Sequence, residues 1–258
     1  MEYAILFLPL IGALLGYVIK VFGDIYSEIV TTLFVSAAAI LSIILFYNGI
    51  VYEDYGNYKI YQWIASGKFI VNASINIDPL SSIMLVVVSL VSALVHIYSI
   101  GYMSHDPDKP RFMCYLSLFT FAMFTLVVSD NFLQLFFGWE GVGLCSYLLI
   151  GFWHKKNSAN NAAIKAFIVN RIGDFGFAIG IFLIFIFFGT LNYEEVFALA
   201  PNFADTEINF LGLEVNLITV TCLFLFIGAM GKSAQFFLHT WLPDAMEGPT
   251  PVSALIHA

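Results

Sequence analysis

Long apolar runs alternate with short polar connections along the whole chain. A helix needs about 20 apolar residues to cross a hydrocarbon core of about 30 Å. Seven runs meet this length, at 3–21, 29–50, 80–103, 112–128, 132–153, 164–188 and 216–241. A further apolar stretch begins after Pro251. The pattern predicts an all-α membrane protein with about seven transmembrane helices and the start of an eighth.

Two longer connections interrupt these runs. Residues 51–79 are rich in Tyr and Asn and contain alternating stretches, which predict a small hairpin or a surface helix. Residues 189–215 are acidic. We divide the chain into an N-terminal three-helix membrane segment, 1–110, with its outer loop at 51–79, and a second segment, 111–258.

The composition supports the membrane assignment. Hydrophobic residues make up 60% of the chain and charged residues 11%, whereas soluble domains carry about 25% charged residues. A water-soluble enzyme and a disordered protein are therefore excluded. The net charge of −8 argues against a nucleic-acid partner. Cys114, Cys145 and Cys222 lie far apart without a C-x-x-C pattern, so the cysteines give no support to a metal site or an iron–sulfur cluster.

Basic residues between the runs predict the orientation. The N-terminal run is too long for the core of a cleavable signal, and Glu2 stands where a signal carries positive charge, so we expect a retained first helix. With the N-terminus outside, five basic residues lie on the inner side and two on the outer side, which satisfies the positive-inside rule. The inner residues are Lys20, Lys109, Arg111, Lys155 and Lys156, and the outer ones are Lys59 and Lys68.

Five further charges lie within the runs: Lys165, Arg171, Lys232, Glu140 and Asp174. A charge at the bilayer centre costs about 2.5–3.5 kcal/mol on insertion scales, so such residues must be paired or used. Glu140 lies about 12 Å into its run among glycines and is expected to face the bundle. Arg171 and Asp174 are three residues apart and predict an ion pair. Lys165, in the first turn of its run, is expected to reach the inner interface.

Lys232 lies near the middle of the seventh run, where Gly228 and Gly231 weaken the helix. Gln235 and His239 continue its face toward the inner end, and His257 lies further along, after Pro251. A lysine, an amide and imidazoles in a row can carry protons through bridging waters. We therefore expect a proton path in which a movable contact between Glu140 and Lys232 tunes proton affinity. Static ion pairs that fix helix register are the alternative.

Several of these segments resemble a known family. Residues 231–235 (GKSAQ) and 241–258 resemble the proton-conducting antiporter-like subunits of respiratory complex I. Residues 138–147 (GWEGVGLCSY) and 170–174 (NRIGD) look most like subunit L, called subunit 5 in mitochondria. The resemblance covers essentially the whole chain.

The resemblance implies an antiporter-like inverted-repeat fold, of which this chain holds the N-terminal half. Residues 111–258 would form the first half-channel from helices 4–8, with helix 7 broken and helix 8 truncated. In the family, the carboxylate matching Glu140 pairs with the lysine matching Lys232, and the histidine matching His257 leads onward from that lysine. Arg171 and Asp174 match a charged pair implicated in coupling.

The sequence departs from the family pattern at the break in helix 7. The family usually has a proline two residues after Gln235, where this chain has Phe237. The break must then rely on Gly228, on Gly231 or on local unwinding.

The sequence thus favours a proton-translocating membrane-arm subunit of an NADH-quinone oxidoreductase, in a bacterial cytoplasmic membrane or, alternatively, the mitochondrial inner membrane. No nucleotide, flavin or iron–sulfur motif is present, so NADH, FMN, iron–sulfur clusters and quinone are expected in partner subunits. The other membrane-arm subunits and the lipid bilayer are the expected partners. The large subunit of a multisubunit Na⁺/H⁺ antiporter and a non-conducting structural subunit remain as alternatives.

Overall fold

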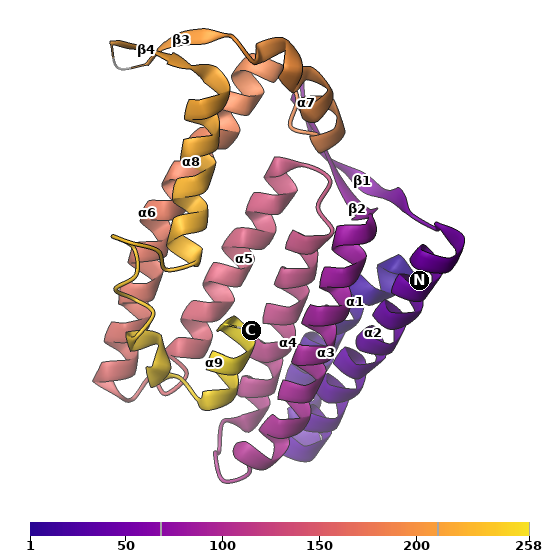
Figure 1. Cartoon of the computed structure of the whole chain (residues 1–258). Helices are drawn as coiled ribbons and strands as arrows, with labels where there is room; N and C mark the ends of the chain where they lie inside the picture. The colour runs from indigo at the N-terminus through magenta and orange to yellow at the C-terminus, as the bar shows by residue number, and fades with distance from the viewer. Residues whose placement is uncertain (68, 211, 258) are drawn as a thin grey trace.

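A computed structural model describes residues 1–67, 69–210 and 212–257, so Lys68, one of the two outer basic residues, lies outside the described part. Within these ranges, six helices are long and apolar enough to cross a membrane. They stand side by side, with α6 at one edge of the bundle and α1 and α2 at the other (Figure 1). The six are α1 Glu2–Ile19, α2 Asp24–Tyr52, α3 Pro79–Tyr102, α4 Lys109–Val127, α5 Phe132–Ile150 and α6 Asn157–Phe188.

The seventh run is only partly helical. Helix α8 covers Leu217–Lys232, which is 16 residues, so the run to residue 241 does not form one continuous helix, and helix 7 is broken as the resemblance implies. Residues 233–249 form turns and a short 3-10 helix, Asp244–Glu247. Helix α9, Thr250–His257, then begins the expected eighth helix and lies between α3 and α5 in Figure 1.

The two longer connections fold into small hairpins, so the chain is mostly helical and not all-α. Strands β1 (Gly56–Ser66) and β2 (Phe69–Ile77) pair antiparallel, with Gly56 opposite Ile77. The alternating sequence of 51–79 thus produces the hairpin, one of its two expected forms. The acidic connection contains α7 (Tyr193–Leu199) and the short hairpin of β3 (Glu207–Phe210) and β4 (Leu213–Asn216).

The β1–β2 hairpin is fixed to the bundle by a polar clamp, which we define as Gln134, Asn131 and their backbone partners. The side-chain amide of Gln134 accepts from the Ser74 N–H (2.9 Å) and donates to the Ser74 carbonyl (2.7 Å). The amide of Asn131 donates to the Asn72 carbonyl at 2.9 Å. The first turn of α5 and its N-cap therefore pair the edge of β2 that β1 leaves open, as buried backbone groups require.

The connection between α4 and α5 holds the start of α7. The N–H of Tyr193 donates to the carbonyl of Asp130 at 3.0 Å, and the Tyr193 hydroxyl lies 3.0 Å from the Ser129 hydroxyl. Burial raises the pKa of Tyr193 to about 12, so this hydroxyl stays protonated at neutral pH. Both connections are thereby anchored at one end of the bundle.

Helices α6 and α8 approach closely because glycines line their contact. A methyl group at Gly173 would lie 3.1 Å from the Cα atom of Gly231, and one at Gly176 would lie 2.6 Å from the Ile227 side chain. A methyl at Gly228 would meet the Phe177 side chain at 2.6 Å. Small residues at such positions let transmembrane helices pack backbone to backbone. This contact sets the position of Lys232, the last residue of α8, against α6.

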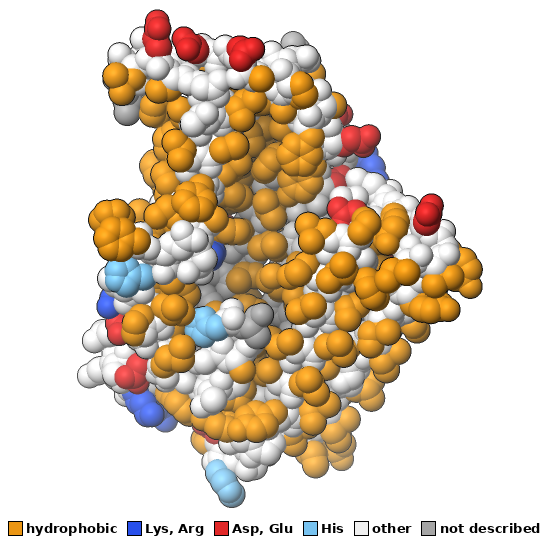
Figure 2. All heavy atoms as spheres, in the orientation of Figure 1, with side chains coloured by type: hydrophobic (Ala, Val, Ile, Leu, Met, Phe, Trp, Pro, Cys, Tyr) orange, Lys and Arg blue, Asp and Glu red, His pale blue; other side chains and the backbone are white. Residues whose placement is uncertain are grey.

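The outside of the bundle suits a bilayer. Hydrophobic side chains cover most of the face shown in Figure 2, and acidic side chains gather at the end that carries the β3–β4 hairpin. The protein is a multi-pass membrane protein.

Candidate functional site

Helix α8 ends at Lys232 in a Schellman motif. The N–H of Gln235 donates to the carbonyl of Met230 (3.0 Å), and the N–H of Ala234 donates to that of Gly231 (3.3 Å). Ala234 takes the left-handed conformation that this motif needs, with φ 51°. Local unwinding therefore ends the helix without the proline expected from the family, while Gly228 and Gly231 serve the packing against α6.

After the break, the chain no longer follows the helix of α8, so the residues after Lys232 do not continue the helix face on which Lys232 lies. Gln235 and His239 are exposed, and His239 stacks on Phe236 with ring centroids 6.3 Å apart. The expected stripe of Lys232, Gln235 and His239 is therefore absent, because the helical periodicity on which it depends stops at Lys232. Trp241 returns to the bundle instead, where its indole N–H donates to the Gly231 carbonyl at 3.1 Å.

Lys232 is paired with Asp174 on α6. The Nζ atom of Lys232 lies 3.9 Å from Oδ1 of Asp174, whose side chain is 5% exposed. The same oxygen accepts a 2.6 Å hydrogen bond from the indole N–H of Trp139 on α5. Trp139 stacks on Phe177 with ring centroids 4.8 Å apart. The indole thus holds the carboxylate on the side that faces Lys232.

Glu140 is paired with Arg171, not with Lys232. Successive residues of a helix point about 100° apart, so Trp139 turns inward toward Asp174 while Glu140 lies on the next face of α5. Arg171 is 47% exposed and reaches Glu140 on that outer face. The two pairings expected from the sequence, Glu140 with Lys232 and Arg171 with Asp174, are exchanged in the structure.

Lys165 forms an ion pair that the sequence did not indicate. Helix α6 begins at Asn157, so Lys165 lies in its third turn and not in its first. Its Nζ atom is 2.8 Å from Oδ2 of Asp244, in the short helix after the break. Beside this pair, the Ser158 hydroxyl donates to Glu247 at 3.1 Å. The acids between the prolines of the 243–251 link therefore bind α6.

His257 lies at the exposed end of α9. Its ring centroid is 6.2 Å from that of Trp241. Leu255 and Ile256, two and one residues earlier, border the central cavity described next, whereas His257 is not among its lining residues.

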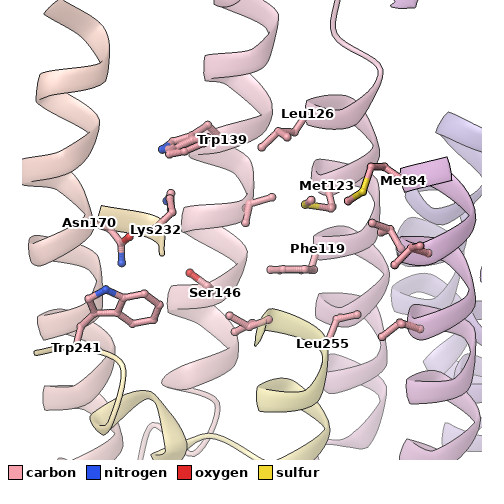
Figure 3. A pocket seen from close by; sticks show the side chains of 15 residues that line it. Met84, Phe119, Met123, Leu126, Trp139, Ser146, Asn170, Lys232, Trp241 and Leu255 are labelled. Carbon is pink, nitrogen blue, oxygen red and sulfur yellow. The ribbon is translucent and has the colours of Figure 1, made fainter. Parts of the chain in front are cut away.

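A cavity of about 290 Å³ lies between α3 and α4 on one side and α5, α6 and α8 on the other (Figure 3). Its α3 and α4 walls are apolar, with Met84, Phe119, Met123 and Leu126. Polar groups enter from the other side, where Figure 3 shows Lys232 beside Asn170, with Trp139 at one end and Trp241 at the other. The mid-membrane lysine thus faces an open space.

Sequence reasoning missed three residues around this lysine. Trp139 and Asn170 appeared in it only as members of motifs, although both are polar groups next to charges at membrane depth. Gly143 carries no chemical signal at all, yet a methyl group there would lie 2.7 Å from Nζ of Lys232, which is its one contact within 4 Å outside the neighbouring turns of α5 in the described part of the chain. Its spacing of four residues from Trp139 was the available clue, because the two share a face of α5.

Comparisons with known proteins agree with this architecture. Residues 129–258 match the family model for "NADH:quinone oxidoreductase/Mrp antiporter, TM", and residues 63–113 match "NADH-Ubiquinone oxidoreductase (complex I), chain 5 N-terminus". Two solved structures share the fold, at 23% and 21% identity over 98% of this chain. They are an Mrp complex from Dietzia sp. (TM-score 0.83, 26% of that chain covered) and an archaeal membrane-bound sulfane sulfur reductase (0.80, 49% covered).

Curated relatives are more similar in sequence. The chain is 54% identical to NADH-quinone oxidoreductase subunit L of Rickettsia bellii, covering 98% of this chain and 40% of that protein. It is 52% identical to NADH-ubiquinone oxidoreductase chain 5 of Chondrus crispus, covering 100% of this chain and 39% of the relative. The chain therefore spans about two fifths of the length of these relatives. It belongs to the NADH-quinone oxidoreductase subunit L / chain 5 family.

Proposed function

We propose that this chain is part of a proton-translocating membrane-arm subunit of NADH-quinone oxidoreductase. Lys232 acts as the proton carrier, Asp174 as its charged partner in the state described, and His257 as the relay beyond Trp241. Glu140, with Arg171, supplies the second carboxylate through which a neighbouring subunit can influence Lys232.

One observation carries the proposal: an ionisable lysine at the broken end of a membrane helix faces a cavity and a buried carboxylate. Lys232 Nζ lies 3.9 Å from Asp174, and Lys232 borders the cavity of about 290 Å³. Intramembrane charges that line a cavity mark ion or proton pathways, and irregular backbone at membrane depth is tolerated where it lines such a space. The ion pair with Asp174 also offsets the cost of burying the charge of Lys232 at this depth.

The subunit works within a larger assembly in this proposal. Residues 1–110 form the supporting three-helix segment and residues 111–258 the first half-channel. NADH, FMN, iron–sulfur clusters and quinone belong to partner subunits, which drive this chain through contacts between membrane-arm subunits. The N-terminus faces the outside of a bacterial cytoplasmic membrane or the equivalent side of a mitochondrial inner membrane.

A multisubunit Na⁺/H⁺ antiporter is the second candidate function, favoured by the shared fold of the Mrp complex. The 23% identity to that structure, against 54% to the Rickettsia bellii subunit, supports the first candidate. Co-purification decides between them: flavin-containing subunits support the oxidoreductase, and antiporter subunits alone support the antiporter.

NADH-driven proton pumping in vesicles tests the proposed carrier. Replacing Lys232 by Ala or by Arg should lower the number of protons pumped per NADH oxidised by about half or more, because neither side chain exchanges a proton at this depth. The exposed loop residue Lys155 provides the control, since Lys155→Ala should pump normally. A scaffold role predicts instead that the Lys232 variants change stability and leave pumping intact, and that result would refute the carrier.

A further inference from the structure

Asn170 is a buried amide in the cavity that the proposed proton path does not use. The residue is 7% exposed. Its Nδ2 atom donates to the Ala166 carbonyl at 2.8 Å, which fixes the orientation of the amide. Its Oδ1 atom is buried and has no hydrogen-bond partner in the described part of the chain. Buried polar atoms nearly always find a partner, so an unpaired acceptor at this place requires an explanation.

The position of Asn170 on α6 supplies the explanation. Asn170 precedes Asp174 by four residues, so the two side chains share a face of α6, roughly 6 Å apart and one turn from each other. Lys232 and Asn170 both line the cavity and lie next to each other in Figure 3. The flexible stem of a lysine is long enough to move its ammonium group over this distance.

The walls of the cavity limit where the ammonium can go. Gly143 leaves room for Nζ on the α5 side, where a methyl group would approach it to 2.7 Å. The ring of Trp139, with its centroid 5.8 Å from Nζ, lies beyond Asp174. On the α3 and α4 sides the lining is apolar. The charged groups that face Lys232 are Asp174 and, further away, Glu140 and Arg171. Ser146 on α5 also lines the cavity, but its hydroxyl donates to the Gly143 carbonyl at 2.8 Å. Asn170 carries the unpaired acceptor, so a move away from Asp174 leads to Asn170.

We propose that Asn170 is a positioning residue that offers the Lys232 ammonium a second, uncharged acceptor, one helical turn from Asp174. The inference rests on Lys232 being the proton carrier. A carboxylate stabilises the charged ammonium, whereas an amide oxygen accepts a hydrogen bond without neutralising the charge. Lys232 thus holds its proton beside Asp174 and releases it more readily beside Asn170. Trp241 borders the cavity on this side, and His257 lies next to Trp241.

The test measures proton pumping by the complete oxidoreductase. The quantity compared is the lysine-dependent part, which is the number of protons pumped per NADH oxidised that is lost in Lys232→Ala. Asn170→Leu removes the second acceptor and should lower this part at least about twofold, with NADH oxidation retained. Asn161→Leu, an exposed position on the same helix, controls for the substitution itself and should have no effect. Asn170→Leu pumping at the wild-type level would overturn the inference.

The near-isosteric Asn170→Asp provides a readout that a purely structural role would not move. A carboxylate at the second position retains the proton to higher pH, so the pH optimum of pumping should rise by about one unit. This variant also decides the question if Asn170→Leu fails to assemble. An unshifted profile would overturn the inference alone, whereas normal pumping by Lys232→Ala would overturn the proposed function and the inference together.

Discussion

Trp139 and Glu140, neighbours on α5, bind different charged groups. Trp139 binds the inward carboxylate of Asp174, while Glu140 binds the outward Arg171. Composition and spacing identified the four charged residues of this site, Glu140, Arg171, Asp174 and Lys232, because charges within apolar runs are conspicuous. The pairing was not predictable, since Arg171 and Asp174 at i and i+3 share a face in an isolated helix. The indole hydrogen bond and the contact of α8 with α6 decide it, and both depend on tertiary packing.

Gly143 offers a test of the lysine site at the scale of a single methyl group. Gly143→Ala should displace the Lys232 ammonium from α5 and lower proton pumping by about half or more, because the methyl would stand 2.7 Å from Nζ. Protein stability should be unchanged or slightly higher, since alanine favours helix by about 1 kcal/mol over glycine.

Gly101→Ala is the matched control for this substitution. Gly101 lies on α3, and a methyl group there would meet nothing within 4 Å. This variant should gain the same helix propensity and pump normally. Equal pumping by the two alanine variants would show that the space beside Nζ has no role.

At the scale of elements, the exact position of the break in α8 is what the sequence indicated least well, although the family resemblance implied a break in this helix. The apolar run continues to Trp241, and neither Phe237 nor Ala234 is a residue that signals a helix end. The Schellman motif forms nonetheless, with Ala234 at φ 51° and a second left-handed residue, Phe237, at φ 74°. The indole of Trp241 stabilises the break by hydrogen-bonding the Gly231 carbonyl.

A glycine at residue 234 should stabilise this break. The left-handed conformation costs an L-residue about 1–2 kcal/mol, and glycine removes that cost. Ala234→Gly should therefore raise the thermal unfolding temperature of the detergent-solubilised protein. Ala229→Gly, five residues earlier within α8, should lower it, because glycine in a helix interior costs about 1 kcal/mol. If both variants raised the unfolding temperature, or both lowered it, the result would contradict the assigned helix end.

At the scale of the whole molecule, hydrophobic run length predicted most of the fold. The six long helices coincide with six of the seven runs, because a bilayer imposes length and apolarity on any spanning helix. The hairpin of residues 51–79 was one of two alternatives. The polar clamp was not predictable, because Gln134 and Asn131 find their partners about 60 residues away in sequence.

The polar clamp predicts that the stability of the β1–β2 hairpin depends on the side chain of Gln134. Gln134→Leu leaves the buried N–H and carbonyl of Ser74 without partners, at about 1–3 kcal/mol for each group. The β1–β2 backbone should then exchange its amide hydrogens faster, as measured by mass spectrometry. Gln62→Leu, at an exposed position on β1, is the comparison and should change little. Protected β2 amides in Gln134→Leu would exclude the clamp.

The glycine contact between α6 and α8 has a mechanical consequence. The backbones touch at Gly173 and Gly231, and the Ile227 and Phe177 side chains pack directly on Gly176 and Gly228, so sliding one helix along the other would push these side chains against backbone. A change in the distance between the Asp174 carboxylate and the Lys232 ammonium must then come from rotation about side-chain bonds. Such rotations leave both helices in place, so a change of partner by Lys232 needs no movement of α8 against α6.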